Sequence, residues 1–135
     1  MRTHPTPLAS YHSGFDLDAL TSVRRAVAGW LSRTEMSHER TCDLTLAVGE
    51  MLGNAIEHGG GSGTVRMSLV GRSVTCLISD EGPGLPDRVD RHHPARPDAA
   101  AVDGRGLWLA FTLCSDVRLS SSTHGTRVEL VADLP

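Results

Sequence analysis

The sequence predicts an α+β domain, in which helices pack on one face of a mixed, mostly antiparallel sheet as a two-layer sandwich. Three observations lead to this prediction. The chain has 135 residues, which is enough for one domain. Two segments carry apolar residues at three- and four-residue steps, as amphipathic helices do. Two pairs of short alternating segments are each joined across a glycine-containing turn, as in β-hairpins.

The first half of the domain is expected to consist of two helices. Residues 1–14 are expected to be a tail or a short strand, and the domain to cover residues 15–135. Asp16 can cap the first helix, and Ser37 can cap the second, which runs to about His58. The apolar stripe of the first helix consists of Leu17, Leu20, Val23, Val27 and Leu31.

The second half is expected to contain two hairpins separated by a long irregular segment and a third helix. The alternating residues of the hairpins span residues 64–79 and 117–131, and the third helix spans residues 106–114. Residues 86–103 follow neither the helical nor the strand period and contain three prolines and seven charges. A segment of this length is typical of a functional lid or of disorder.

The composition excludes several functions. All 13 basic residues are arginine, against 16 acidic residues, for a net charge of -3. A chain without lysine cannot be a P-loop NTPase, a eukaryotic-type protein kinase or a Schiff-base enzyme. The mild acidity argues against a nucleic-acid binder. No membrane helix, signal peptide or disulfide framework is apparent, so we expect a cytoplasmic protein that binds neither nucleic acid nor membrane.

The first cluster with chemical potential lies on the second predicted helix, where Glu50, Asn54 and Glu57 share one stripe beside the apolar one. A carboxylate and an amide one turn apart can point into one cleft. There the amide oxygen can ligate Mg²⁺ and the carboxylate can accept a proton. By itself, the pattern also fits an ordinary solvated helix face.

The second cluster follows a predicted apolar strand and begins at Asp80, with Gly82 and Gly84 shortly after it. A carboxylate at the edge of a sheet can accept a hydrogen bond from an exocyclic amine such as adenine N6. The glycines let the backbone turn sharply and approach a flat ligand. A plain turn explains the same residues equally well.

Two further clusters combine glycine with a helix start or a turn. Gly104, Arg105, Gly106 and Leu107 lie where the third helix begins, and free N–H groups at such a position can bind an anion. A helix cap with a hinge is the alternative. Thr126 and the glycine before it lie between the last two strands, where a hairpin turn suffices as an explanation.

The order and spacing of the four clusters resemble the GHKL ATPase superfamily, which includes histidine-kinase catalytic domains and the ATPase domains of gyrase and Hsp90. The resemblance covers residues 15–131, and the clusters look like the N-box, the D-x-G-x-G adenine box, the glycine box and the last box. It implies a Bergerat-type ATP-binding fold. The compact length is most similar to the bacterial anti-sigma-factor serine kinases.

The resemblance implies ATP and Mg²⁺ as ligands and gives roles to individual residues. Glu50 would be the general base, Asn54 would hold Mg²⁺, and Asp80 would accept from adenine N6. The remaining contacts to the base and the phosphates would come from Gly82, Gly84, Thr126, Gly104, Arg105, Gly106 and Leu107. One departure is Gly49, which stands where the family more often has a hydroxyl residue.

A protein of this family would phosphorylate an anti-anti-sigma protein on serine or threonine and sequester a sigma factor. The 36 residues before Ser37 hold no tandem helical hairpin for a phosphoacceptor histidine, so histidine autophosphorylation is not expected. The alternatives are a nucleotide-gated binding module without turnover, a water-directed ATPase and a fold with a decayed site. Members of the family often dimerise. Arg24 and Arg25, on the polar side of the first helix, are ordinary exposed arginines or touch a partner.

Overall fold

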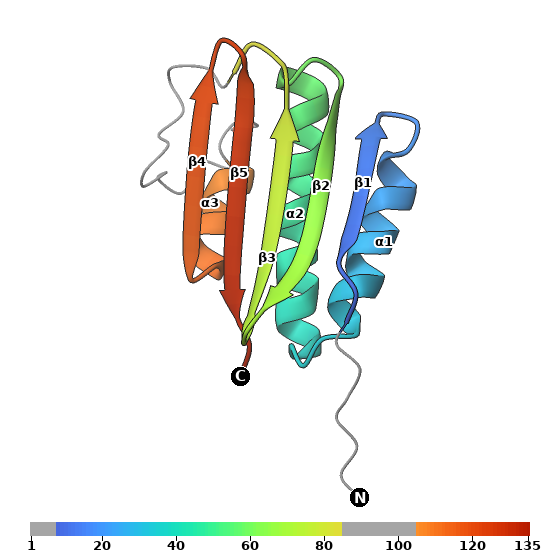
Figure 1. Cartoon of the computed structure of the whole chain (residues 1–135), viewed down its shortest axis with the longest axis vertical. Coiled ribbons are helices and arrows are strands. Elements are labelled where there is room, and N and C mark those ends of the chain that lie inside the picture. Colours follow the sequence, from blue (N-terminus) through green and yellow to red (C-terminus); the bar gives the residue numbers. More distant parts are fainter. Residues whose placement is uncertain (1–7, 85–104) are drawn as a thin grey trace, which may run out of the picture.

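The computed structural model describes residues 8–84 and 105–135, which form one sheet and three helices. The elements in chain order are β1 (Tyr11–Asp16), α1 (Leu20–Ser32), α2 (His38–His58), β2 (Ser62–Val70), β3 (Ser73–Asp80), α3 (Arg105–Leu113), β4 (Asp116–Ser122) and β5 (Gly125–Asp133). The sheet has the strand order β1-β2-β3-β5-β4, and every described pairing is antiparallel. All three helices lie on one face of the sheet (Figure 1), which confirms the predicted α+β sandwich.

The segment before the first helix contains a short strand, which was one of the two expected alternatives, whereas the predicted helix cap does not form. Residues 11–14 belong to β1, an edge strand that pairs with β2. Asp16 does not cap the helix itself. Its Oδ1 accepts a hydrogen bond from the Ala19 N–H at 2.9 Å within the turn that follows β1, and α1 begins at Leu20 without a side-chain cap. Because Leu17 lies in this turn, it is exposed and does not join the predicted apolar stripe.

The second helix follows the prediction at both ends. The Ser37 hydroxyl accepts a hydrogen bond from the Arg40 N–H at 3.2 Å, which satisfies one of the free N–H groups of the first turn. The helix ends at His58, and Gly59 is its C-cap. Its last turn therefore lies next to the end of β3, because Gly59 packs directly against the Asp80 side chain.

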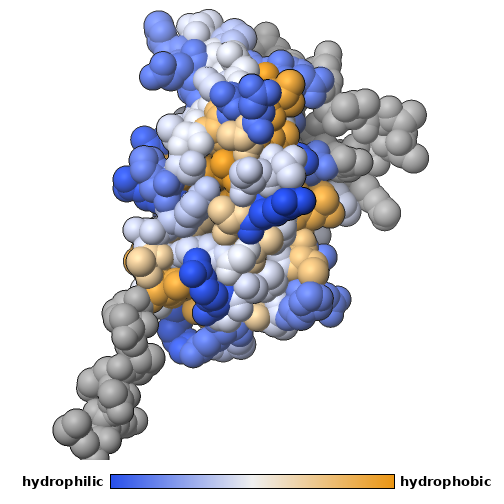
Figure 2. Space-filling model, turned by 90° about the vertical axis from the view of Figure 1, so that its right-hand side faces the viewer, coloured by the Kyte–Doolittle hydropathy of each residue, from blue (hydrophilic) through white to orange (hydrophobic). Residues whose placement is uncertain are grey.

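The core lies between the helices and the inner face of the sheet, and most of its side chains are aliphatic. Trp30 is fully buried, and its indole N–H donates to the Ala9 carbonyl at 2.7 Å, so the residues before β1 are tied to α1. Among the residues that the structure describes, the large exposed apolar ones are Leu17, Leu46 and Val70, each in a different part of the fold. Figure 2 shows the side of α1 and β1, where hydrophobic and hydrophilic residues are interspersed.

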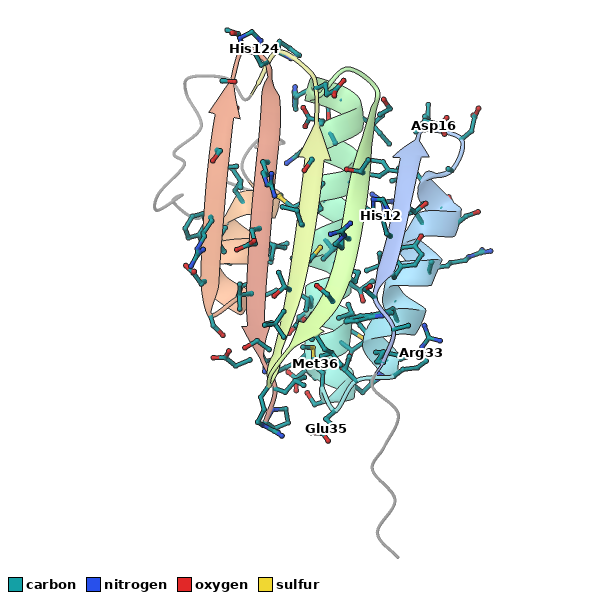
Figure 3. All side chains as sticks on the ribbon, viewed as in Figure 1. His12, Asp16, Arg33, Glu35, Met36 and His124 are labelled. Atoms are coloured by element: carbon teal, nitrogen blue, oxygen red, sulfur yellow. The ribbon has the colours of Figure 1, made fainter. Side chains whose placement is uncertain are left out.

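The described loops gather at two ends of the sheet (Figure 1). The hairpin between β2 and β3 turns at Gly71, as predicted, with a φ of 61° that suits glycine. The turn between β4 and β5 lies at the opposite end of the sheet, where Figure 3 shows His124, while Met36 and Glu35 lie near the first hairpin. The end with His124 is also the end at which β3 finishes. The predicted lid, residues 86–103, lies outside the described residues.

Candidate functional site

A narrow pocket lies between α2, α3 and the inner face of β3 and β5. Its apolar walls come from Met51, Ala55, Ile78, Leu107 and Val128, and its polar groups from Asn54, His58, Asp80 and Thr126. The cavity has a volume of about 20 Å³, which is room for about one water molecule. Apolar walls with a few convergent polar groups are typical of small-molecule sites.

Asp80 is held in place by backbone hydrogen bonds at the edge of the pocket. As the last residue of β3, it pairs with Thr126 of β5. Its Oδ1 accepts two backbone hydrogen bonds, from Gly82 at 3.0 Å and from Thr126 at 3.3 Å. The described residues provide no donor to Oδ2. The carboxylate therefore has a fixed orientation and one oxygen left to accept a hydrogen bond from a ligand.

The glycines around Asp80 allow three loops to approach one another closely. A Cβ on Gly82 would lie 2.3 Å from the Gly59 carbonyl carbon, and one on Gly59 would lie 2.4 Å from Cγ of Asp80. Gly84 has a φ of 93°, and a Cβ there would lie 2.3 Å from the Ser122 carbonyl oxygen. Because Gly82 and Gly84 have no side chain, their backbone packs directly against neighbouring backbone at the rim of the pocket.

The structure brings Asn54 to the pocket and separates it from Glu57. Asn54 is half-buried and lines the pocket, and Glu50, one turn earlier on α2, is also half-buried. Glu57, which the sequence placed on the same stripe, is 62% exposed and lies 4.0 Å from His58 Nε2. The polar stripe of α2 therefore splits into a half-buried part and a solvated part.

The glycine box coincides with the start of α3. Arg105 and Gly106 are the first two residues of the helix, and only their backbone is described. Leu107 is buried and forms part of the pocket wall. Gly104 lies outside the described residues. The backbone thus starts a helix at the predicted position, beside the pocket.

Arg24 occupies a position that the sequence did not reveal. Its Nη2 donates to the Gly49 carbonyl on α2 at 3.1 Å. A Cβ on Gly49 would lie 3.2 Å from Arg24 Nε, and one on Gly53 would lie 3.7 Å from Nη2. The guanidinium therefore lies along the glycine face of α2, on the residues that directly precede Glu50 and Asn54.

Sequence reasoning missed most of the apolar walls and His58 as parts of the site. Inward-facing positions are predictable from strand alternation, and Ile78 and Val128 alternate as expected. Nothing local distinguishes those positions from the rest of the core. Only the packing of α2 and α3 over the sheet shows which of them face a cavity.

The described part of the chain carries neither a membrane helix nor a preformed metal cluster. None of its three helices combines the length and apolar character needed to cross a bilayer. Within residues 8–84 and 105–135, no three His, Cys, Asp or Glu side chains are arranged to hold a metal ion. This arrangement remains compatible with a cation that takes one oxygen from a side-chain amide and the others from a bound small molecule and water.

Comparison with known proteins gives a consistent result. The family model of the histidine kinase-like ATPase domain matches residues 15–132. The anti-sigma F factor of Clostridium novyi is 30% identical over 115 residues, which cover 78% of this chain and 80% of that protein. The histidine-protein kinase AfsQ2 of Streptomyces coelicolor is 25% identical over 112 residues, which cover 73% of this chain and 21% of that protein.

A solved structure shows the same fold. The RsbU and RsbW domains of Rv1364c from Mycobacterium tuberculosis are 26% identical to the chain, with a TM-score of 0.69, over 96% of this chain and 32% of that one. The chain thus spans most of the anti-sigma F factor, but about a fifth of the histidine kinase and a third of the mycobacterial chain.

Proposed function

The chain belongs to the histidine kinase-like ATPase domain family, and from this premise we propose that it is an ATP-dependent serine/threonine kinase of the anti-sigma type. It phosphorylates an anti-anti-sigma protein and sequesters a sigma factor, in the cytoplasm and as a homodimer. The name of the Clostridium novyi relative supports this class of partner. The nucleotide-binding part rests on one observation, the fixed Asp80 carboxylate among the apolar walls of the pocket.

In this proposal the pocket binds adenine. The apolar walls cover the faces of the base, and Oδ2 of Asp80 accepts a hydrogen bond from the N6 amino group. Thr126 completes the polar edge, and the loop with Gly82 and Gly84 forms the rim. Because the cavity is only about 20 Å³, space for about one water molecule, base binding requires the cavity to widen.

The phosphates extend from the base toward the start of α3. Gly104, Arg105 and Gly106 are assigned to them, since backbone N–H groups at a helix start and a guanidinium both favour phosphate oxygens. This arrangement replaces the lysine that P-loop proteins use. It is therefore compatible with a chain whose basic residues are all arginine.

Mg²⁺ fits the donor set of α2. Asn54 directs an amide-bearing side chain to the pocket, and Mg²⁺ in phosphoryl-transfer sites takes one or two protein oxygens and completes its shell with water and phosphates. When bound, Mg²⁺ neutralises developing charge on the phosphates. Asn54 would supply the protein oxygen.

Glu50 is the proposed general base, one turn of α2 before Asn54. Its carboxylate takes the proton of the acceptor serine hydroxyl while the serine oxygen forms a bond to the γ-phosphorus. The bond from the γ-phosphorus to the bridging oxygen breaks, and ADP leaves with the electron pair. The products are phosphoserine and ADP.

The test is γ-phosphate transfer from Mg·ATP to an anti-anti-sigma protein. We expect Glu50→Gln to reduce transfer at least 100-fold, as loss of a general base does, while ADP affinity stays within about twofold. Glu57→Gln, an exposed carboxylate on the same helix, is the matched control and should transfer normally. Transfer that survives Glu50→Gln would refute the role of Glu50.

The same assay separates the other functions. A wild-type protein that binds ADP but forms none from ATP would be a nucleotide-gated binding module. ADP release without a protein partner would indicate a water-directed ATPase. A wild-type protein that binds neither ATP nor ADP would have a decayed site.

A further inference from the structure

One row of side chains crosses three strands behind the pocket. Ser121 of β4 pairs with Thr126 of β5, and Thr126 pairs with Asp80 of β3. Ser121 Oγ lies 3.0 Å from Thr126 Oγ1, and the Thr126 N–H donates to Asp80 Oδ1. Asp80 and Thr126 line the pocket, whereas Ser121 reaches it through Thr126.

The two hydroxyls share one hydrogen bond, and its direction determines what Thr126 offers to a ligand. A hydroxyl has one proton to donate and two lone pairs to accept. If Ser121 donates, the Thr126 proton is available to the pocket. If Thr126 donates instead, it presents only lone pairs there.

Adenine selects between the two directions. Its N6 amino group is a donor, which matches the Asp80 carboxylate, and the adjacent ring nitrogen N1 is an acceptor, which requires a donor. The Thr126 backbone N–H already donates to Asp80. The Thr126 hydroxyl is therefore the next group in the row that can donate to N1, directly or through one water.

We propose that Ser121 is a positioning residue for base recognition, which donates to Thr126 Oγ1 and so reserves the Thr126 proton for adenine N1. The inference rests on the proposed function, because it assumes that the pocket binds adenine. It extends that function by naming the residue that determines whether Thr126 offers a hydrogen-bond donor or only an acceptor to the base.

The rim of the pocket supports this assignment. A Cβ on Gly84 would lie 3.0 Å from Ser121 Oγ and 2.3 Å from the Ser122 carbonyl oxygen. A side chain at position 84 would therefore press on the Ser121 hydroxyl. The glycine that ends the D-x-G-x-G segment leaves Ser121 in the orientation that reaches Thr126.

The experiment compares ADP with 1-deaza-ADP, in which a C–H group replaces N1, by calorimetry on the full chain with Mg²⁺. We expect Ser121→Ala to weaken ADP binding about fivefold, the effect of one ordinary hydrogen bond, because the Thr126 hydroxyl loses the donor that orients its own proton toward N1. Binding of 1-deaza-ADP should stay within about twofold, because the atom that Thr126 addresses is missing. Ser121→Thr, which keeps the hydroxyl, should restore most of the ADP affinity.

Ser120→Ala is the matched control, because Ser120 is the preceding residue of β4 and is exposed on the other face of the sheet. It should change neither affinity. Equal weakening of both ligands by Ser121→Ala, or weakening of neither, would overturn the inference while leaving the proposed function intact. A wild-type protein that binds no ADP would overturn the proposed function and this inference with it.

Discussion

The three cysteines differ in burial, and their reactivity should follow it. Burial raises the pKa of the Cys114 thiol to about 11, with Arg40 opposing part of the effect. Burial also raises the pKa of Cys76, further than that of Cys114. Cys42 is exposed on α2. Since the thiolate is the reactive form, we expect iodoacetamide at pH 8 to label the exposed Cys42 first, and the raised pKa to slow Cys114 about 100-fold relative to the same thiol at its ordinary value of 9.0.

Peptide mass spectrometry of timed samples measures the three labelling rates, and unfolding in guanidinium should expose Cys76 and Cys114 together. The sign for stability follows from the same shifts. Folding raises both pKa values, so this contribution to stability is complete below the ordinary value of 9.0 and is lost as pH rises through about 11 for Cys114 and at higher pH for Cys76. Labelling of native Cys76 at the rate of Cys42 would contradict its burial.

Among single residues, the sequence identified those whose role depends on local pattern. Asp80 follows an apolar strand, and Asn54 lies on a helix with a clear apolar stripe, so both could be predicted as candidate site residues, and both line the pocket. Arg24 and Ser121 could not. Their partners, Gly49 and Thr126, are found only when α1 packs on α2 and when β4 pairs with β5.

The contact between α1 and α2 provides a test at the scale of elements. Gly29 on α1 has open space where a Cβ would be, whereas a Cβ on Gly49 would meet Arg24 Nε at 3.2 Å. Glycine to alanine within a helix adds about 0.5–1 kcal/mol of stability. We expect Gly29→Ala to gain that amount. Gly49→Ala should gain little, because displacing Arg24 costs a hydrogen bond of about 0.5–1.5 kcal/mol.

Urea unfolding of the two variants measures the difference. The same substitutions are then made in a protein that carries Arg24→Ala. Because the guanidinium is absent there, Gly49→Ala should stabilise that protein as much as Gly29→Ala does. Equal gains in the wild-type background would show that the Arg24 contact contributes nothing to the packing of the two helices.

Element types could be predicted more reliably than their ends. Both ends of α2 were predictable, because Ser37 and Gly59 are specific cap signals and the stripe between them is long. The start of α1 was not, since an aspartate can accept from a backbone N–H in a turn as well as at a helix N-cap. The strand β1 extends past its expected end because pairing with β2, a distant segment, determines its length.

At the scale of the whole molecule, the two hairpins and the single helical layer followed from the sequence of elements, whereas the order of the strands in the sheet and the width of the pocket did not. The volume of the cavity depends on how closely α3 approaches α2 and the sheet. A shift of α3 by no more than the size of a methyl group changes that volume. No local pattern encodes that distance. The structure shows a cavity of about 20 Å³, so adenine binding at the proposed site would require α2, α3 and the sheet to move apart.

Binding should therefore appear as stability of the entire domain. A ligand at 100 times its dissociation constant stabilises the folded state by about 2.7 kcal/mol, and we expect Mg·ADP to raise the unfolding midpoint accordingly. Asp80→Asn keeps the acceptor for Gly82 and Thr126 but loses the charge, so binding should weaken about 10- to 100-fold. At the same ADP concentration its stabilisation should fall to about 0.4–1.4 kcal/mol.

Removing the metal distinguishes the two halves of the site. EDTA should reduce the ADP-dependent shift in the wild type, because phosphate binding then loses Mg²⁺, whereas Asn54→Ala should show a small shift that EDTA no longer changes. Asp18→Asn, an exposed carboxylate in the turn before α1, is the control and should behave as wild type. Differential scanning calorimetry at fixed ADP measures the wild type and the Asp80→Asn, Asn54→Ala and Asp18→Asn variants.

A thermal shift in Asp80→Asn as large as in the wild type would place the nucleotide elsewhere, since the pocket contains no second carboxylate among the residues that line it.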